Sequence, residues 1–65
     1  MLILLLWRAG NNQNYYFIDV DGTYSYKTDT RDGFDDRLFS TGNYFETKEE
    51  AKSSVIWKAF HPEEV

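Results

Sequence analysis

Clustered carboxylates are the most reactive feature of this 65-residue sequence. The polar stretch from Thr28 to Arg37 (TDTRDGFDDR) carries four aspartates and two arginines. Carboxylates can bind calcium, but an EF-hand loop needs acidic residues at alternate positions and a final glutamate, and this spacing fails that pattern. Its polarity and Gly33 predict a solvated loop with Phe34 tucked beneath it. The sharper alternative is an acidic contact surface that attracts a basic partner, formed by Asp29, Asp32, Asp35 and Asp36.

A second pair of carboxylates lies in Phe17-Ile18-Asp19-Val20-Asp21-Gly22-Thr23, which is similar to the first motif of the haloacid-dehalogenase-type phosphatases. The resemblance implies Asp19 as nucleophile and Asp21 as acid/base, with magnesium between them. In that family the chemistry takes place at the edge of a parallel sheet with helical crossovers, for which this chain is too short. The same residues are ordinary turn formers, so we expect no phosphatase activity.

Other catalytic and metal-binding combinations are weaker. The serines have one possible base, His61, which precedes a proline at an expected helix end and has no evident oxyanion site beside it. The absence of cysteine excludes disulfides and a thiolate zinc site. We therefore expect no enzymatic activity, no metal and no cofactor.

The run from Tyr15 to Tyr26 predicts a β-hairpin. Asp19 and Gly22 stand at the first and fourth positions of a turn, as a type I turn closed by a left-handed glycine prefers. This register pairs Ile18 with Tyr24 and Tyr16 with Tyr26 on one face. The opposite face then holds Tyr15, Phe17, Ser25 and Lys27. The alternative, a two-residue turn of Asp21-Gly22, would pair Phe17 with Tyr26 and exchange the faces of one strand.

Three further segments complete the expected architecture. The apolar run from Leu2 to Trp7 predicts a buried strand, followed by a turn over Ala9 to Asn14, and Leu38-Phe39-Ser40 predicts a short strand. Thr47 and Glu50 form a capping-box pattern that predicts a helix from Lys48 to Phe60. His61-Pro62 should end it. Its apolar half holds Ala51, Val55, Ile56, Ala59 and Phe60.

These elements predict one α+β domain over residues 1–65: a small antiparallel three- to four-stranded meander with one C-terminal helix packed on one face. We expect a core that includes Leu4, Leu6, Ile18, Phe45, Val55, Ile56 and Phe60. Trp57 falls outside the apolar half of the helix, where it either covers the sheet edge or anchors a partner. Tyr15 and Phe17 are the matching candidates on the sheet, for a protein partner or for stacked bases.

The formal net charge of −4 argues against direct nucleic-acid binding, which requires lysines and arginines to neutralise phosphates. A basic or nucleic-acid-binding protein is the more suitable partner. The N-terminal apolar run lacks a basic flank and is too short for a signal peptide or a membrane span, so we expect a cytoplasmic setting.

The segment from Tyr15 to about Phe60, with Tyr-Tyr-Phe-Ile, the Asp-Gly turn and Gly42-Asn43-Tyr44-Phe45-Glu46-Thr47-Lys48-Glu49-Glu50-Ala51, resembles small uncharacterised proteins of phages and prophages of Gram-positive bacteria. The resemblance implies a phage setting inside a bacterial host and no particular catalytic residues. We expect a protein-binding module, most concretely an inhibitor of a host defence or nucleic-acid-processing protein. The alternatives are a structural or accessory phage protein without a host target and, more distantly, a nucleic-acid-binding module or a phosphatase-like enzyme.

The N-terminal run also suggests an oligomer. A strand alternates faces, and both faces of this run are apolar, so one helix cannot cover all of its large side chains. An identical copy is the simplest cover for the second face. We therefore expect a homodimer whose interface includes Leu2, Leu4, Leu5, Leu6 and Trp7.

Overall fold

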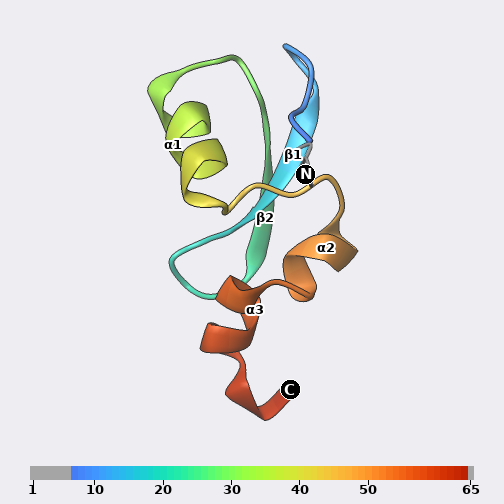
Figure 1. Ribbon diagram of the computed structural model, residues 1–65, viewed down its shortest axis with the longest axis vertical. Coiled ribbons are helices and arrows are strands. Elements are labelled where there is room, and N and C mark those ends of the chain that lie inside the picture. Colours follow the sequence, from blue (N-terminus) through green and yellow to red (C-terminus); the bar gives the residue numbers. More distant parts are fainter. Residues whose placement is uncertain (1–6, 65) are drawn as a thin grey trace, which may run out of the picture.

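The computed structural model describes residues 7–64 as an α+β fold in which helices lie on both sides of a β-hairpin (Figure 1). Strands β1 (Asn14–Ile18) and β2 (Tyr24–Thr28) form the hairpin. Three helices follow, α1 (Gly33–Thr41), α2 (Lys48–Lys52) and α3 (Val55–Phe60), and a short 3₁₀ helix, η1 (Pro62–Glu64), ends the described chain. The predicted α+β class is confirmed. The expected strand from Leu2 and the core residues Leu4 and Leu6 lie outside the described residues.

The hairpin has the predicted bulged turn and register. Ile18 pairs with Tyr24 and Tyr16 with Tyr26. The Gly22 N–H donates to the Asp19 carbonyl over 2.9 Å, and the Asp19 N–H donates to the Thr23 carbonyl over 2.8 Å. Gly22 has a φ of +87°, a conformation in which a side chain would be strained. The two-residue turn is therefore wrong.

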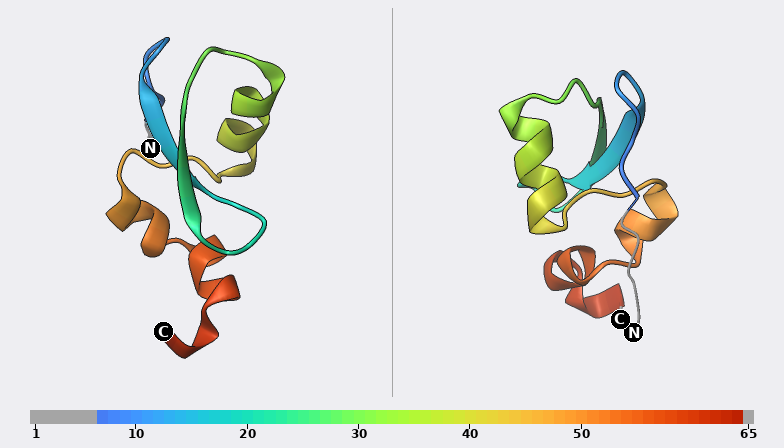
Figure 2. Two further views of the ribbon diagram at one scale, coloured as in Figure 1. Left: turned by 180° about the vertical axis from the view of Figure 1, so that it is seen from behind. Right: turned by 45° about the horizontal axis from the view of Figure 1, so that its top comes forward.

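Each face of the hairpin carries its own apolar cluster, because side chains alternate along a strand. Tyr15 and Phe17 pack with Ala9 and Tyr44, against Leu38 and Phe39 at the α1 side. Ile18 packs on the other face with Ala51 and Trp57, flanked by Tyr16, Phe45 and Ile56. Figures 1 and 2 show α1 on one side of the hairpin and α2 with α3 on the other. Two thin clusters thus replace the single helix-covered face that we expected.

The segment after α1 crosses β1 and occupies its outer edge (Figure 1). Tyr16 and Phe45 exchange two backbone hydrogen bonds of 2.8 Å each. Next to them, the Asn43 amide accepts from the Ile18 N–H over 2.7 Å and donates to the Ile18 carbonyl over 2.8 Å, as a neighbouring strand would. β1 therefore has partners along both edges, whereas β2 is an edge strand.

Helix α1 corrects two expectations. The loop predicted from Thr28 to Arg37 ends at Asp32, and Leu38-Phe39-Ser40 is helical and not a strand. Asp32 caps the helix by accepting from the Asp35 N–H, and the Asp35 side chain accepts from the Asp32 N–H, so the two form a capping box. Gly42, with a φ of +83°, ends the helix in the left-handed conformation.

The predicted helix from Lys48 to Phe60 is two helices. Thr47 caps α2 by accepting from the Glu50 N–H over 3.1 Å, as predicted, but α2 ends at Lys52. Ser54 is extended, and its hydroxyl accepts from the Trp57 N–H, so it starts α3 as a new helix. His61 ends α3 before Pro62, in agreement with the sequence.

This break rotates the expected apolar face. Trp57 is buried against Ile18 and Ala51, whereas Val55 is 83% exposed and belongs to neither core cluster. Phe60 is about half exposed and contacts the hairpin turn, where a Cβ added at Gly22 would meet its ring at 2.8 Å. The predictions of Val55 and Phe60 as core residues are wrong, while Ile18 is buried and Ile56 and Phe45 are partly buried as expected.

Candidate functional site

The predicted acidic surface is largely an internal ionic network. The side chain of Asp29 is fully buried. Its carboxylate accepts from the Tyr44 hydroxyl over 2.6 Å, the Arg31 guanidinium over 2.8 Å and the Arg31 N–H over 2.8 Å. Arg8 adds a longer contact of 3.3 Å. Arg31 also reaches the Ala9 carbonyl, so the network ties the chain before β1 to the loop after β2.

Asp35 is the second buried carboxylate of this network. It accepts from the Tyr15 hydroxyl over 2.6 Å, from Lys27 Nζ over 2.7 Å and from the Thr30 N–H over 2.9 Å. The rings of Tyr15 and Tyr44 stack at 4.1 Å, so the two phenol–carboxylate pairs lie side by side in the core. Every buried side-chain nitrogen and oxygen among the described residues has a partner.

The pKa values of the network follow from its contacts. Burial alone would raise the pKa of both aspartates, but their hydrogen-bond donors lower it. The donors to Asp29 come from Tyr44, Arg31 and Arg8. Those to Asp35 come from Lys27, Tyr15 and Thr30. Burial and the adjacent carboxylate raise the pKa of Tyr15. The carboxylates are therefore ionised and the phenols neutral at physiological pH. The network links the chain before β1, both strands and the loop after β2 to helix α1.

Asp29 and Asp35 thus correct the expected contact surface, because buried side chains cannot meet a partner. Asp32 and Asp36 are exposed, but both are already paired: Asp32 with Lys27 over 3.3 Å and Asp36 with Arg8 over 2.6 Å. Composition revealed the four aspartates, but their burial depends on partners far away in the sequence.

The three aromatic anchor candidates are also buried. Tyr15 is fully enclosed, and Phe17 and Trp57 are each 8% exposed. Trp57 stacks on the His61 ring at 4.0 Å, and the His61 Nε2 lies 2.7 Å from the Gly22 carbonyl. These residues join α3 to the hairpin turn, and base stacking on Tyr15 and Phe17 is not possible in this structure.

Other aromatic side chains are exposed, and two of them lie on the edge strand β2. Tyr26 is 68% exposed and Tyr24 37% exposed, and both rings approach the Tyr16 ring at about 6 Å. Tyr16 uses its backbone N–H and carbonyl to bond Phe45, so Tyr16 and Tyr26 are a pair without mutual backbone hydrogen bonds. The backbone N–H and carbonyl of Tyr26 therefore point away from β1. No other strand in residues 7–64 pairs with this side of β2. We call Tyr24, Tyr26 and their outward backbone groups the β2 edge.

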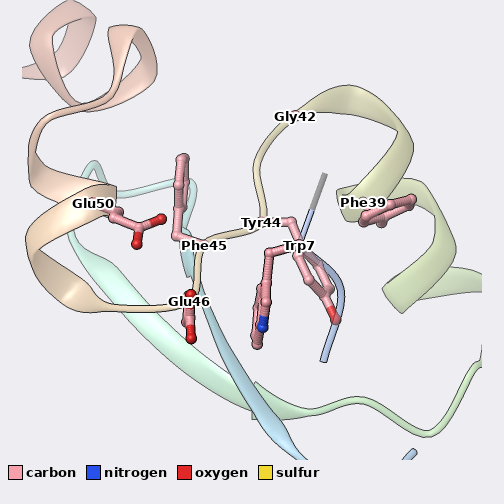
Figure 3. A pocket seen from close by; sticks show the side chains of 7 residues that line it. All are labelled: Trp7, Phe39, Gly42, Tyr44, Phe45, Glu46 and Glu50. Atoms are coloured by element: carbon pink, nitrogen blue, oxygen red, sulfur yellow. The ribbon is translucent and has the colours of Figure 1, made fainter. Parts of the chain in front are cut away.

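A hollow of about 490 Å³ lies beside Trp7, next to the segment that crosses β1 (Figure 3). Trp7 is 37% exposed, and its ring lies 5.6 Å from that of Tyr44. Figure 3 shows Glu46 and Glu50 on one side of the hollow and Phe39 on the other. Gly42 and Phe45 complete the lining. We call this site the Trp7 hollow.

The phosphatase-like motif lies in the antiparallel turn. Asp19 accepts from the Val20 N–H over 2.8 Å, and Asp21 accepts from the Thr23 hydroxyl over 2.7 Å and its N–H over 3.0 Å. The bonds from Thr23 lower the pKa of Asp21, whereas a proton donor needs a raised one. No group of three or more potential metal ligands occurs among the described residues. Within the same residues, no helix is long and apolar enough to cross a bilayer.

Comparisons with known proteins give no relative for this chain: no family model, no curated protein and no solved structure matches it.

Two of these features escaped the sequence analysis. The edge position of β2 depends on Asn43 and Phe45 occupying β1, and these contacts span 25 or more residues of chain, which no local pattern predicts. The Trp7 hollow combines residues from the N-terminal segment, α1, the segment that crosses β1, and α2. The only local signal was the group Tyr44-Phe45-Glu46, where aromatic and acidic residues stand together.

Proposed function

We propose that this chain is a protein-binding module without enzymatic activity and that a partner adds to the β2 edge. The supporting observation is the combination of an unpaired strand edge with two exposed tyrosines. An open edge offers backbone donors and acceptors to an extended segment of another protein, while alternate side chains supply specificity. Tyrosine provides large contact area at low entropic cost and is common at binding hot spots.

The charge distribution favours a basic partner. The four aspartates from Asp29 to Asp36 are paired with Arg8, Lys27 and Arg31, which offset all but one of their negative charges. Glu46, Glu49 and Glu50 have no such ion pair among the described residues. A net charge of −4 then lies mainly outside the network, where it can speed association with a basic protein.

The resemblance to phage and prophage proteins suggests the biological setting. In that setting the module would be an inhibitor that blocks a host defence or nucleic-acid-processing protein in the bacterial cytoplasm. The competing proposal is an accessory phage protein without a host target.

Affinity capture from a bacterial host lysate tests the proposal, with infection and defence assays beside it. The proposal predicts a specific host protein that is retained by the natural chain and lost with Tyr26→Lys, because a charge on an edge strand opposes pairing. No specific partner, together with no effect on host immunity, would favour the accessory protein.

The absence of catalysis has its own test. Incubation with magnesium and a generic phosphate ester should give no turnover, because Asp19 and Asp21 are occupied by turn contacts. Turnover that Asp19→Asn abolishes would show a phosphatase.

We also propose that the module is a homodimer formed by the apolar run from Leu2 to Trp7. Trp7, its one described member, is 37% exposed, and we place its ring at the rim of the dimer interface, where it stays accessible to another partner. Sedimentation at micromolar concentration should give twice the chain mass of 7.7 kDa, and Leu5→Glu should give monomers. A natural chain that sediments as a 7.7 kDa species would refute the dimer.

A further inference from the structure

We propose that the Trp7 hollow is a binding site for a cationic side chain, lysine or arginine, of the partner protein. The inference rests on the proposed function, since it names the chemistry by which a basic partner would be recognised. It concerns a different surface from the β2 edge, so the two can be tested separately.

Aromatic rings form much of the lining of the hollow. The Tyr44 ring lies between those of Trp7 and Phe39, with centroid distances of 5.6 Å to Trp7 and 5.3 Å to Phe39. The Phe39 and Tyr44 rings are nearly perpendicular, at 83°. Aromatic faces carry negative charge density and attract cations, and tryptophan does so most strongly. The volume of about 490 Å³ lies within the usual range of ligand pockets, roughly 300–1,000 Å³.

The molecule already uses two of these rings for a cation. The Arg8 guanidinium lies 4.7 Å from the Phe39 centroid and 6.0 Å from that of Tyr44. Arg8 is not part of the hollow's lining, and its charge is neutralised by Asp29 and Asp36. A guanidinium therefore lies against the Phe39 ring in this structure, which leaves Trp7 as the ring that the hollow offers to a second cation.

Two carboxylates supply the charge complement. Glu46 and Glu50 both line the hollow and are exposed. Neither has an ion pair with another described residue, in contrast to the aspartates of the network. An anionic ligand would be repelled here, and a neutral apolar one would gain nothing from the carboxylates. The alkyl part of a lysine or arginine side chain can pack on the aromatic rings, while its charged group donates hydrogen bonds to the carboxylates.

A second hollow of about 470 Å³ continues the site. It shares Trp7 and Glu46 with the first and is otherwise lined by Asn12, Gln13 and Asn14. These amide side chains can donate to and accept from the backbone that flanks the cationic residue. The pair of hollows thus fits a short extended peptide with one basic side chain.

The test is a titration of the ¹⁵N-labelled protein with three capped tripeptides, Ac-Gly-Lys-Gly-NH₂, Ac-Gly-Arg-Gly-NH₂ and the norleucine analogue. Norleucine keeps the alkyl stem of lysine and lacks the ammonium group. The lysine and arginine peptides should shift the Trp7 indole signal and the Glu46 amide, and should bind about fivefold or more tightly than the norleucine peptide. The buried indole of Trp57 serves as an internal reference.

The carboxylates are tested by Glu46→Gln with Glu50→Gln, which should weaken the basic peptides by about tenfold. Glu49→Gln is the matched control, because Glu49 lies in the same helix and does not line the hollow. Equal binding of the norleucine peptide, insensitivity to the double variant, or no binding at about 10 mM peptide would overturn the site.

The outcome separates the site from the proposed function. If a captured partner binds the double glutamine variant as well as it binds the natural chain, the cation site is refuted and the proposed protein-binding function is retained. If the basic peptides bind while no protein is captured and host immunity is unaffected, the site is supported and the proposed function is refuted.

Discussion

Replacing Asp35 by asparagine should cost this small fold a large part of its stability. The carboxylate is buried and accepts short hydrogen bonds from Tyr15, Lys27 and Thr30. Asparagine keeps one acceptor oxygen but places an NH₂ donor against groups that are themselves donors. It also removes the negative charge that compensates Lys27.

The magnitude follows from these contacts. Breaking a buried ion pair by removing one partner costs about 3–5 kcal/mol. Lys27 is partly exposed and keeps its contact with Asp32, so the lower end, about 3 kcal/mol, applies. A chain of 65 residues has a total stability of roughly 3–10 kcal/mol, at about 0.05–0.15 kcal/mol per residue. The variant should therefore be near or beyond the limit of folding.

Urea denaturation followed by tryptophan fluorescence and circular dichroism measures this effect. Asp36→Asn is the matched control, since it makes the same charge change at an exposed neighbour and should cost no more than about 1 kcal/mol. Tyr15→Phe removes one hydrogen bond to the same carboxylate and should cost about 1.5–3 kcal/mol, which keeps the test usable if the asparagine variant does not fold. Equal midpoints for Asp35→Asn and Asp36→Asn would refute the reasoning.

Three further predictions concern stability. The folded-state pKa values of Asp29 and Asp35 are lowered, so their stabilisation is present above the unfolded pKa of about 3.9 and is lost as the pH falls below it. In urea titrations Tyr15→Phe, which removes a donor from Asp35, should make the free energy of unfolding fall less steeply towards acid pH, and an unchanged pH dependence would contradict this account. Gly22→Ala should cost about 1–2 kcal/mol or more from its positive φ and the nearby Phe60 ring, whereas Gly33→Ala should be neutral, and equal thermal midpoints would count against the turn geometry. Trp57→Ala should lower the free energy of unfolding by about 3–5 kcal/mol and Val55→Ala by less than about 0.5 kcal/mol. The reverse order in denaturation would instead support a single continuous helix.

Local chemistry was sufficient to predict the hairpin. The register depends on Asp19 and Gly22, which stand three residues apart and determine the turn without help from the rest of the chain. The start of α2 was predictable for the same reason, because Thr47 caps the helix through the N–H of Glu50.

The helix boundaries were harder to predict from the sequence. Asp32 and Asp35 form the capping box at the start of α1, and Gly42 ends the helix. Such polar and glycine residues are equally typical of a loop. Ser53-Ser54 interrupts the second helical pattern, because Ser54 caps α3 with its hydroxyl. Apolar periodicity across such a break assigns Val55 and Trp57 to the wrong faces.

The candidate sites depended on long-range contacts and could not be predicted. Whether an aspartate is a surface charge or a buried ion depends on Tyr15, Tyr44 and Lys27, which approach it only after folding. The same holds for the free edge of β2, which exists because Asn43 and Phe45 occupy β1 instead.

The central claim is tested most directly by the affinity of the captured partner for two proline variants. Tyr26→Pro removes an outward backbone N–H from the β2 edge without breaking the hairpin, because that group points away from β1. Val55→Pro is the matched control, since proline is favoured at the first position of a helix. We predict that the partner binds Val55→Pro as it binds the natural chain and loses affinity at least tenfold for a folded Tyr26→Pro. Equal affinity for all three proteins would contradict binding at the β2 edge.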